Sequence, residues 1–177
     1  MATTQNPRAR RRWGRGLSLI EVLATTALVG MGVAGMMVAA ASGSRVTGGA
    51  LNVSQASYLL QEVREWTLKL PFSDTDPADQ GNPPGPDGSN PQVFVDDLDD
   101  LYVSGTGSLS YSPPRDGTGA AINGMSDWKQ TIQLTWRDVN ELTRVVPASS
   151  SDVIHVEVTV LRNNQPVLTS GWFVTRR

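Results

Sequence analysis

The feature that most constrains this chain is an uncharged run of twenty residues, Val22–Ala41, close to its N-terminus. A helix of this length spans about 30 Å, which matches the hydrocarbon core of a bilayer. Many of the residues are glycine or alanine, and so many glycines make a poor helix in water. In lipid the backbone must satisfy its own hydrogen bonds, which enforces a helix. The run therefore predicts a membrane-spanning helix.

The charges around this run are distributed unevenly. Residues 1–16 carry five arginines and no acid, whereas the rest of the chain carries ten basic and seventeen acidic side chains. Basic residues beside a membrane span stay in the cytoplasm, so we expect the acidic body to cross the membrane. An acidic body is poorly suited to bind phosphates, and no nucleic-acid partner is expected.

Three interpretations of this N-terminal segment compete. A secretory signal peptide would be cut after Ala39–Ala41 and leave a chain beginning near Gly43, but its apolar core normally spans only about 7–15 residues. A plain single-pass anchor fits the length and the charges. It leaves Glu21 unexplained, because a carboxylate at the head of a membrane span is costly and usually has a partner or a function.

The third interpretation rests on the stretch GLSLIE, Gly16–Glu21, between the arginines and the apolar run. It resembles the processing motif of type IV prepilins and pseudopilins. The resemblance implies that a prepilin peptidase/methyltransferase cuts between Gly16 and Leu17, removes the basic leader and methylates the new amino group of Leu17. The family most often has phenylalanine where this chain has Leu17, and another apolar residue there is compatible with processing.

The resemblance also assigns a role to Glu21, which matches the acid of the family motif. Its carboxylate would neutralise the new α-amine of a neighbouring subunit, and a low dielectric would strengthen that pairing. The implied partners are other pilin or pseudopilin subunits, an inner-membrane assembly platform and the lipid bilayer. The implied location is the bacterial inner membrane, with a cytoplasmic N-terminus and an external C-terminal domain, and later a surface or periplasmic filament.

Apolar residues continue at helical spacing beyond the membrane run, up to a proline at position 71. We expect one long helix from Leu19 to about Leu70, with the glycines of positions 43–49 ending its membrane half or loosening it. Tyr58 and Trp66 are expected to be core contacts of the amphipathic half. The apolar positions are Leu51, Tyr58, Leu59, Val63, Trp66 and Leu70.

Two acidic segments follow. Ser73–Pro91 holds five prolines, three glycines and four aspartates, and is expected to be a loop. Oxygen-rich clusters suit calcium, yet neither Asp74, Asp76 and Asp79 nor the run Asp96–Asp100 has EF-hand spacing. We expect both groups to be solvated and expect no metal site.

The C-terminal half is patterned as strands. Thr131–Val139 and Val153–Leu161 alternate apolar and polar residues, and Val167–Val174 follows a turn at Asn163–Asn164 that suits a tight hairpin. Shorter strands are expected at Leu101–Ser104 and Ser108–Ser112. The fold class expected is α+β, a long N-terminal helix packed on a small antiparallel sheet, which is a pilin-like layout. The expected segments are the leader 1–16, the membrane helix 17–41, its amphipathic continuation 42–71, the loop 72–92 and the β region 93–177.

No constellation for catalysis is visible. The chain has no cysteine and one histidine, His155, on the polar side of its strand. No serine stands beside a candidate base, and no glycine motif suits a phosphate. We expect no catalytic, cofactor-binding or metal-binding residue and no enzymatic activity.

The expected function is therefore structural. The resemblance favours a minor pilin or pseudopilin of a type IV pilus or a type II secretion pseudopilus, and does not distinguish the two. The alternative is a single-pass membrane-anchored binding module with no filament role.

Overall fold

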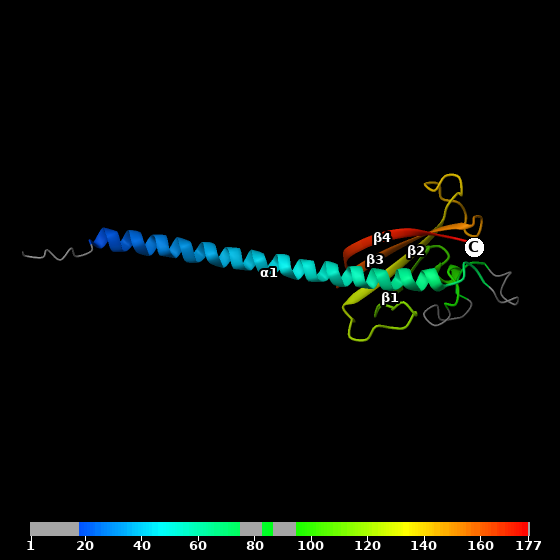
Figure 1. Cartoon of the computed structure of the whole chain (residues 1–177), viewed down its shortest axis with the longest axis horizontal. Helices are drawn as coiled ribbons and strands as arrows, with labels where there is room; N and C mark the ends of the chain where they lie inside the picture. Colours follow the sequence, from blue (N-terminus) through cyan, green and yellow to red (C-terminus); the bar gives the residue numbers. More distant parts are fainter. Residues whose placement is uncertain (1–17, 75–82, 87–94, 177) are drawn as a thin grey trace, which may run out of the picture. The chain divides into compact units, whose positions relative to one another are not determined.

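The computed structural model describes residues 18–74, 83–86 and 95–176 (Figure 1). The chain divides into two compact units, residues 1–47 and 48–177, and each is described by itself. In the first unit the described residues after Ser18 all belong to helix α1. The second unit, which we call the body, holds the rest of α1, a short 3₁₀ helix and a sheet.

Helix α1 spans Leu19–Lys69, so the predicted long helix is confirmed. The glycines at positions 43, 48 and 49 do not end it. The last turn closes through the N–H of Leu70, which donates to the carbonyl of Trp66 at 3.3 Å. Pro71 follows and cannot continue the helix, because it has no N–H to donate.

Four strands form one antiparallel sheet in the order β1-β2-β3-β4. They are β1 (Ser108–Tyr111), β2 (Trp128–Trp136), β3 (Val153–Arg162) and β4 (Gln165–Thr175). The predicted strands after position 105 are confirmed, although β2 begins and ends three residues earlier than expected. Beyond Trp136 the chain leaves the sheet for a loop, held by a bridge between Arg137 and Val145.

The hairpin between β3 and β4 follows the expected chemistry. Asn163 and Asn164 both adopt positive φ, 50° and 61°, which a two-residue type I′ turn requires. The turn pairs Arg162 with Gln165, and the register shifts once, between Val160 and Leu161. Asparagine tolerates this conformation better than most residues, so the local sequence explains the turn.

The predicted strand Leu101–Ser104 is wrong. Its first residue instead ends the 3₁₀ helix η1 (Asp99–Leu101), Tyr102 and Val103 pair with no described strand, and a turn begins at Ser104. The Asp97 carboxylate accepts the N–H groups of Asp99 and Asp100 at 2.9 and 3.1 Å. Aspartate favours such turns over strands because its short side chain bonds to nearby backbone.

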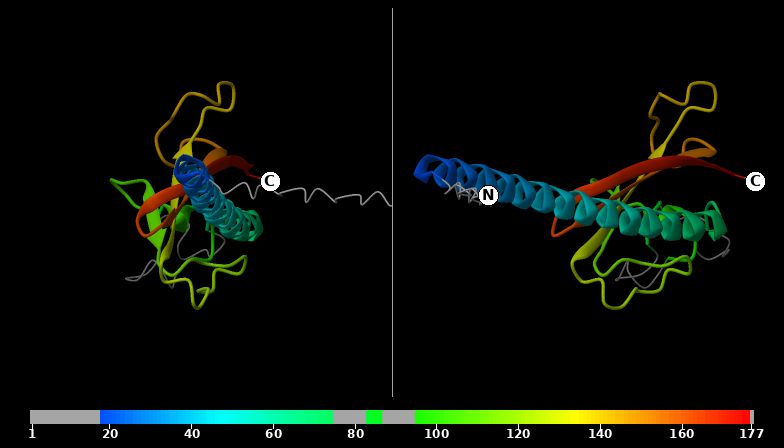
Figure 2. Two further views of the ribbon diagram at one scale, coloured as in Figure 1. Left: turned by 90° about the vertical axis from the view of Figure 1, so that its left-hand side faces the viewer. Right: turned by 60° about the vertical axis from the view of Figure 1, so that its left-hand side comes forward.

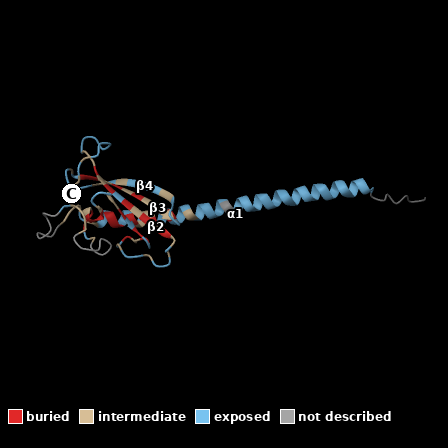
Figure 3. Ribbon diagram, turned by 180° about the vertical axis from the view of Figure 1, so that it is seen from behind, coloured by how far each residue is buried: buried red, intermediate tan, exposed pale blue. Residues whose placement is uncertain are grey.

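The core of the body lies between α1 and the inner face of the sheet, and the buried residues gather there (Figures 2 and 3). Ala56, Leu59, Val63 and Trp66 form the buried face of α1. Opposite them lie alternate residues of the strands, which explains the alternation read from the sequence. They include Leu109, Tyr111, Ile132, Leu134, Ile154, Val156, Val158 and Val160.

Of the two aromatic residues expected in this core, only one is there. Trp66 is buried and meets the Tyr111 ring edge-on, with the ring centroids 5.7 Å apart. Tyr58 is half exposed, so its prediction is wrong. It lies on the edge of α1, where a hydrogen bond to Glu62 raises the pKa of its hydroxyl. The hydroxyl of tyrosine explains this position, because that polar group needs a hydrogen-bond partner.

Gln130 is the polar residue that ties the layers together. It is fully buried on β2, and its Nε2 donates to the carbonyl of Leu59 on α1 at 2.8 Å. The same amide donates to the carbonyl of Arg115 at 3.1 Å and accepts the Arg115 N–H at 2.6 Å. A buried amide with its partners in place specifies how helix, strand and loop sit together.

We predict that Gly119→Ala destabilises the body more than Gly124→Ala does. Both glycines have φ near +81°, so each alanine costs about 1 kcal/mol in backbone conformation. A Cβ at Gly119 would lie 2.9 Å from the indole of Trp66, whereas a Cβ at Gly124 meets open space. Crowding of a packed site costs about 1–3 kcal/mol more.

The measurement is urea unfolding of the full chain in detergent micelles, followed by tryptophan fluorescence. Equal losses for the two variants would contradict the packing of Trp66 against Gly119.

Candidate functional site

The candidate site is the start of α1 and the apolar surface that follows it. Gly16 and Leu17, between which cleavage is expected, lie outside the described residues, and the description begins at Ser18. The carbonyl of Ser18 accepts the N–H groups of Glu21 and Val22 at 3.0 and 3.2 Å. Its hydroxyl also accepts the Glu21 N–H, at 3.3 Å. Ser18 is therefore the N-cap residue of the helix.

Glu21 stands in the first turn of α1, three residues after this cap. A carboxylate there interacts favourably with the helix dipole. Serine followed three residues later by glutamate is also the spacing of a capping box, a signal that the sequence reasoning missed. Within the residues that the structure describes, Glu21 forms no ion pair. It thus has a local explanation besides the pairing that the motif implies.

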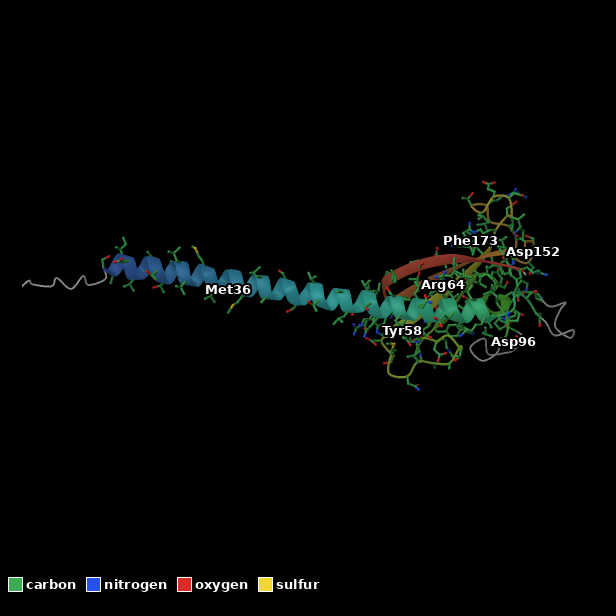
Figure 4. The ribbon with its side chains drawn as sticks, in the orientation of Figure 1. Met36, Tyr58, Arg64, Asp96, Asp152 and Phe173 are labelled. Carbon is green, nitrogen blue, oxygen red and sulfur yellow. The ribbon has the colours of Figure 1, made fainter. Side chains whose placement is uncertain are left out.

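The surface of α1 in the first unit is apolar and uncovered. Every described side chain from Ser18 to Thr47 is exposed, and the helix around Met36 shows this in Figure 4. Among the described residues, α1 is the one helix long and apolar enough to cross a membrane. The large apolar residues exposed there are Leu19, Ile20, Val22, Leu23, Leu28, Val29, Met31, Val33, Met36, Met37, Val38 and Val46.

Five hydroxyl groups in this part of α1 form hydrogen bonds to the backbone of the same helix. Thr25 and Thr26 each donate to the carbonyl four residues before them, at 2.5 Å. Ser42, Ser44 and Thr47 do the same at 2.9–3.1 Å. An unpaired hydroxyl is costly in hydrocarbon, so these bonds let polar side chains enter lipid.

Glycines open the same surface to close approach. A Cβ added at Gly30 or Gly35 would meet nothing within 4 Å, so neither glycine is required by packing inside the chain. Gly30 with Ala34 and Gly35 with Ala39 have the spacing that lets membrane helices approach closely. These positions can therefore contact another helix.

A second group of functional side chains lies in the acidic turn Asp96–Asp100. The prediction that these carboxylates are solvated is wrong for two of them, since Asp97 and Asp100 are buried. Asp100 accepts the N–H groups of Asp96 and Asp97 at 2.9 and 3.2 Å, and Asp97 caps η1 as described above. Leu98 and Leu101 anchor the turn in the core, which carries these aspartates inside.

Burial is the main reason why both carboxyls hold their protons strongly. It raises the pKa of Asp97 to about 8 and that of Asp100 to about 7. Carboxylate oxygens of Asp96, Asp97 and Asp100 lie within 4.8 Å of one another, close enough to hold a cation. Backbone N–H groups already occupy one oxygen each of Asp97 and Asp100. The expectation of no metal stays a prediction, and Asp76 and Asp79 lie outside the described residues.

His155 lies on the outer face of β3, as predicted. Its ring is 5.0 Å from that of Phe173 on β4 and covers Gly171, where a Cβ would come within 2.6 Å of Nε2. Partial burial and the nearby Arg137 lower its pKa, so it is mainly neutral at pH 7. This arrangement gives His155 a packing role across the strands.

Comparison with known proteins leaves the family open. No family model, no curated protein and no solved structure matches this chain significantly.

We predict that the body becomes less stable as the pH rises. Asp97 and Asp100 bind protons more tightly in the folded state than in the unfolded state, where aspartate has a pKa of about 3.9. The stability from their protonation is therefore complete below about pH 4 and is lost as the pH rises through 7–8. Urea unfolding from pH 5 to pH 9 should show the midpoint falling.

The variant Asp97→Asn keeps an oxygen for the N–H groups and removes the charge, so it should flatten this profile. Asp152→Asn changes an exposed aspartate and should leave the profile as it is. A midpoint that rises with pH in the unmodified chain would contradict the prediction.

Proposed function

We propose that this chain is a structural subunit of the type IV pilin class, a minor pilin or pseudopilin. In this proposal it is inserted in the inner membrane and assembled into a type IV pilus or a type II secretion pseudopilus. The observation that carries the proposal is a conjunction. A basic leader and the GLSLIE motif come directly before a helix whose apolar surface is fully exposed in the single chain.

The exposed surface supports an assembling subunit for a physical reason. An apolar surface this long is unfavourable in water and must be covered by lipid or by other helices. The self-bonded hydroxyls suit the first environment, and the open glycines suit the second. A pilin-like subunit uses both in turn, first as a membrane protein and then within a filament.

The partners proposed follow from this role. A prepilin peptidase/methyltransferase would cut between Gly16 and Leu17 and methylate Leu17. Other pilin or pseudopilin subunits would cover the apolar face of α1, and an inner-membrane platform would drive their assembly. The body would then lie on the filament exterior. In this proposal the chain performs no catalysis.

A membrane-anchored binding module is the second candidate, and one observation favours it. The loop between β2 and β3 exposes three aliphatic side chains, Val139, Leu142 and Val145, by 45–59%. The loop is held by backbone bonds between Asp138 and Arg144 and between Arg144 and Glu141. An ordered loop that exposes apolar side chains is typical of a binding surface.

We predict that the mature protein lacks residues 1–16 and carries one methyl group on Leu17. The reason is the resemblance of Gly16–Glu21 to the prepilin motif, in which a membrane peptidase cuts after the glycine that ends a basic leader and methylates the new terminus. Intact mass measurement of the protein extracted from native membranes tests this. A mature chain that retains its arginines would favour the plain anchor, and one that begins near Gly43 would favour a secreted domain.

We predict that Glu21→Ala and Glu21→Gln both leave membrane insertion intact and both impair filament assembly. Glutamine can take the place of glutamate in a capping box but cannot neutralise an amine. The measurement is the amount of sheared filament in cells that express each variant at equal membrane levels.

Ser18→Ala is the matched control, since it removes the cap hydroxyl and keeps the carboxylate. If Glu21→Gln assembles normally while Ser18→Ala does not, Glu21 serves the helix start and the pairing role is wrong.

A further inference from the structure

The loop between β1 and β2 holds the dipeptide Asn123–Gly124, whose two residues can react with each other. Asparagine is a labile residue, because the backbone nitrogen of the next residue can attack its side-chain amide carbon. A glycine at that next position leaves the nitrogen accessible, since it has no side chain. The chain has eight asparagines, and only Asn123 is followed by glycine.

The other asparagines are followed by residues that hinder this attack. Three of them precede a proline, which has no N–H, and four precede a residue with a longer side chain. The first three are Asn6, Asn82 and Asn90, and the other four are Asn52, Asn140, Asn163 and Asn164. The sequence therefore singles out one asparagine.

The structure leaves this asparagine free to react. Asn123 and Gly124 form an exposed turn in the loop between β1 and β2 (Figure 1). Among the described residues, neither the Asn123 side chain nor the Gly124 N–H has a hydrogen-bond partner. Gly124 has a φ of 81°, and a Cβ added there would meet nothing within 4 Å. The turn therefore has room for the cyclic product of the attack.

The related dipeptide Asp116–Gly117, which can cyclise in the same way, is blocked by the fold. The Gly117 N–H donates to the carboxylate of Glu62 on α1 at 2.6 Å, so its nitrogen is already engaged. An Asp116 carboxylate oxygen accepts the hydroxyl and the N–H of Thr118 at 2.6 and 2.8 Å. These bonds lower the pKa of Asp116, and a charged carboxylate is a poor target for a nucleophile. Another such dipeptide, Asp87–Gly88, lies outside the described residues.

The residues on either side of the turn are anchored. Ile122 and Met125 pack against the core of the body. The carbonyl of Met125 also accepts the N–H of Trp128 at 3.1 Å, where β2 begins. A change in the backbone at Asn123–Gly124 is therefore confined to the turn, and the body stays folded.

We propose that Asn123–Gly124 is a self-modification site, at which the folded body converts Asn123 to a mixture of aspartate and isoaspartate. The Gly124 nitrogen forms a bond to Cγ of Asn123, the bond from Cγ to Nδ2 breaks, and ammonia leaves with the proton of the attacking N–H. Water then adds to either carbonyl of the cyclic imide and opens the ring. Each converted molecule gains one negative charge, and the isoaspartate form gains one backbone atom at the turn.

The test is incubation of the full chain in detergent micelles at neutral pH, both folded and unfolded in urea. Digestion and electron-transfer fragmentation then locate aspartate and isoaspartate residue by residue. We expect Asn123 to convert at a similar rate in both states, and Asp116 to form isoaspartate only in the unfolded chain. Isoelectric focusing of the folded chain should show a growing acidic band. A folded chain that keeps Asn123 while the unfolded chain converts it would overturn the proposal.

Two variants separate this chemistry from a general effect on the fold. Gly124→Ala places a methyl group beside the attacking nitrogen and should slow the conversion about tenfold, which is about 1.4 kcal/mol in the barrier. Gly105→Ala makes the same change at another open glycine with positive φ, away from Asn123, and should leave the rate unchanged. Equal rates in the two variants would overturn the role of Gly124. The inference concerns the body alone, so it stands or falls separately from the proposed function.

Discussion

The contact between the buried face of α1 and the inner face of the sheet is the interaction on which the body depends. Ala56, Leu59, Val63 and Trp66 cover strands that would otherwise expose a continuous apolar face. Gln130 fixes their alignment, since its amide reaches a carbonyl of the helix from the middle of β2. The turn beside this helix needs a glycine at position 119, because the Trp66 indole leaves no room for a Cβ there.

The same helix meets two different environments along its length. In the body the sheet covers one face of α1, which holds Ala56, Leu59, Val63 and Trp66. In residues 19–41 apolar side chains surround the helix, and they are exposed in the part of the chain that the structure describes. The change in periodicity therefore records a change in what surrounds the helix. This is why a single secondary-structure element can belong to a folded body and also support a proposal about assembly.

Most of the fold could be predicted because its signals are periodic. Alternation in β2 and β3, and the Asn163–Asn164 turn, correspond to pairing and burial in the structure. Two of the wrong predictions arise from the acidic turn Asp96–Asp100, where aspartate side chains bond to the nearby backbone. Asp97 turns the chain where Leu101 suggested a strand, and two leucines carry acidic neighbours into the core. The pair Leu98 and Leu101, three residues apart, was the available signal for burial of the run.

The candidate site was predictable to a different degree. The apolar segment is visible from composition alone, and its exposure agrees with that expectation. The cap by Ser18 is predictable from its spacing to Glu21, although the motif resemblance gives a role to the acid alone. The position of β4 at an edge of the sheet could not be predicted, since which strand ends a sheet depends on the order of all four.

The side chain of Arg162 has a mechanical consequence. It binds Asp127 at 2.8 Å, contacts Asn52 of α1 and stacks on the Trp128 ring. At the other end of the same stretch, Lys69 holds the carbonyl of Gly117. A force applied along the body part of α1 would therefore act on two attachments, the contact of Asn52 with Arg162 and the bond of Lys69 to Gly117. Both would carry the force in shear.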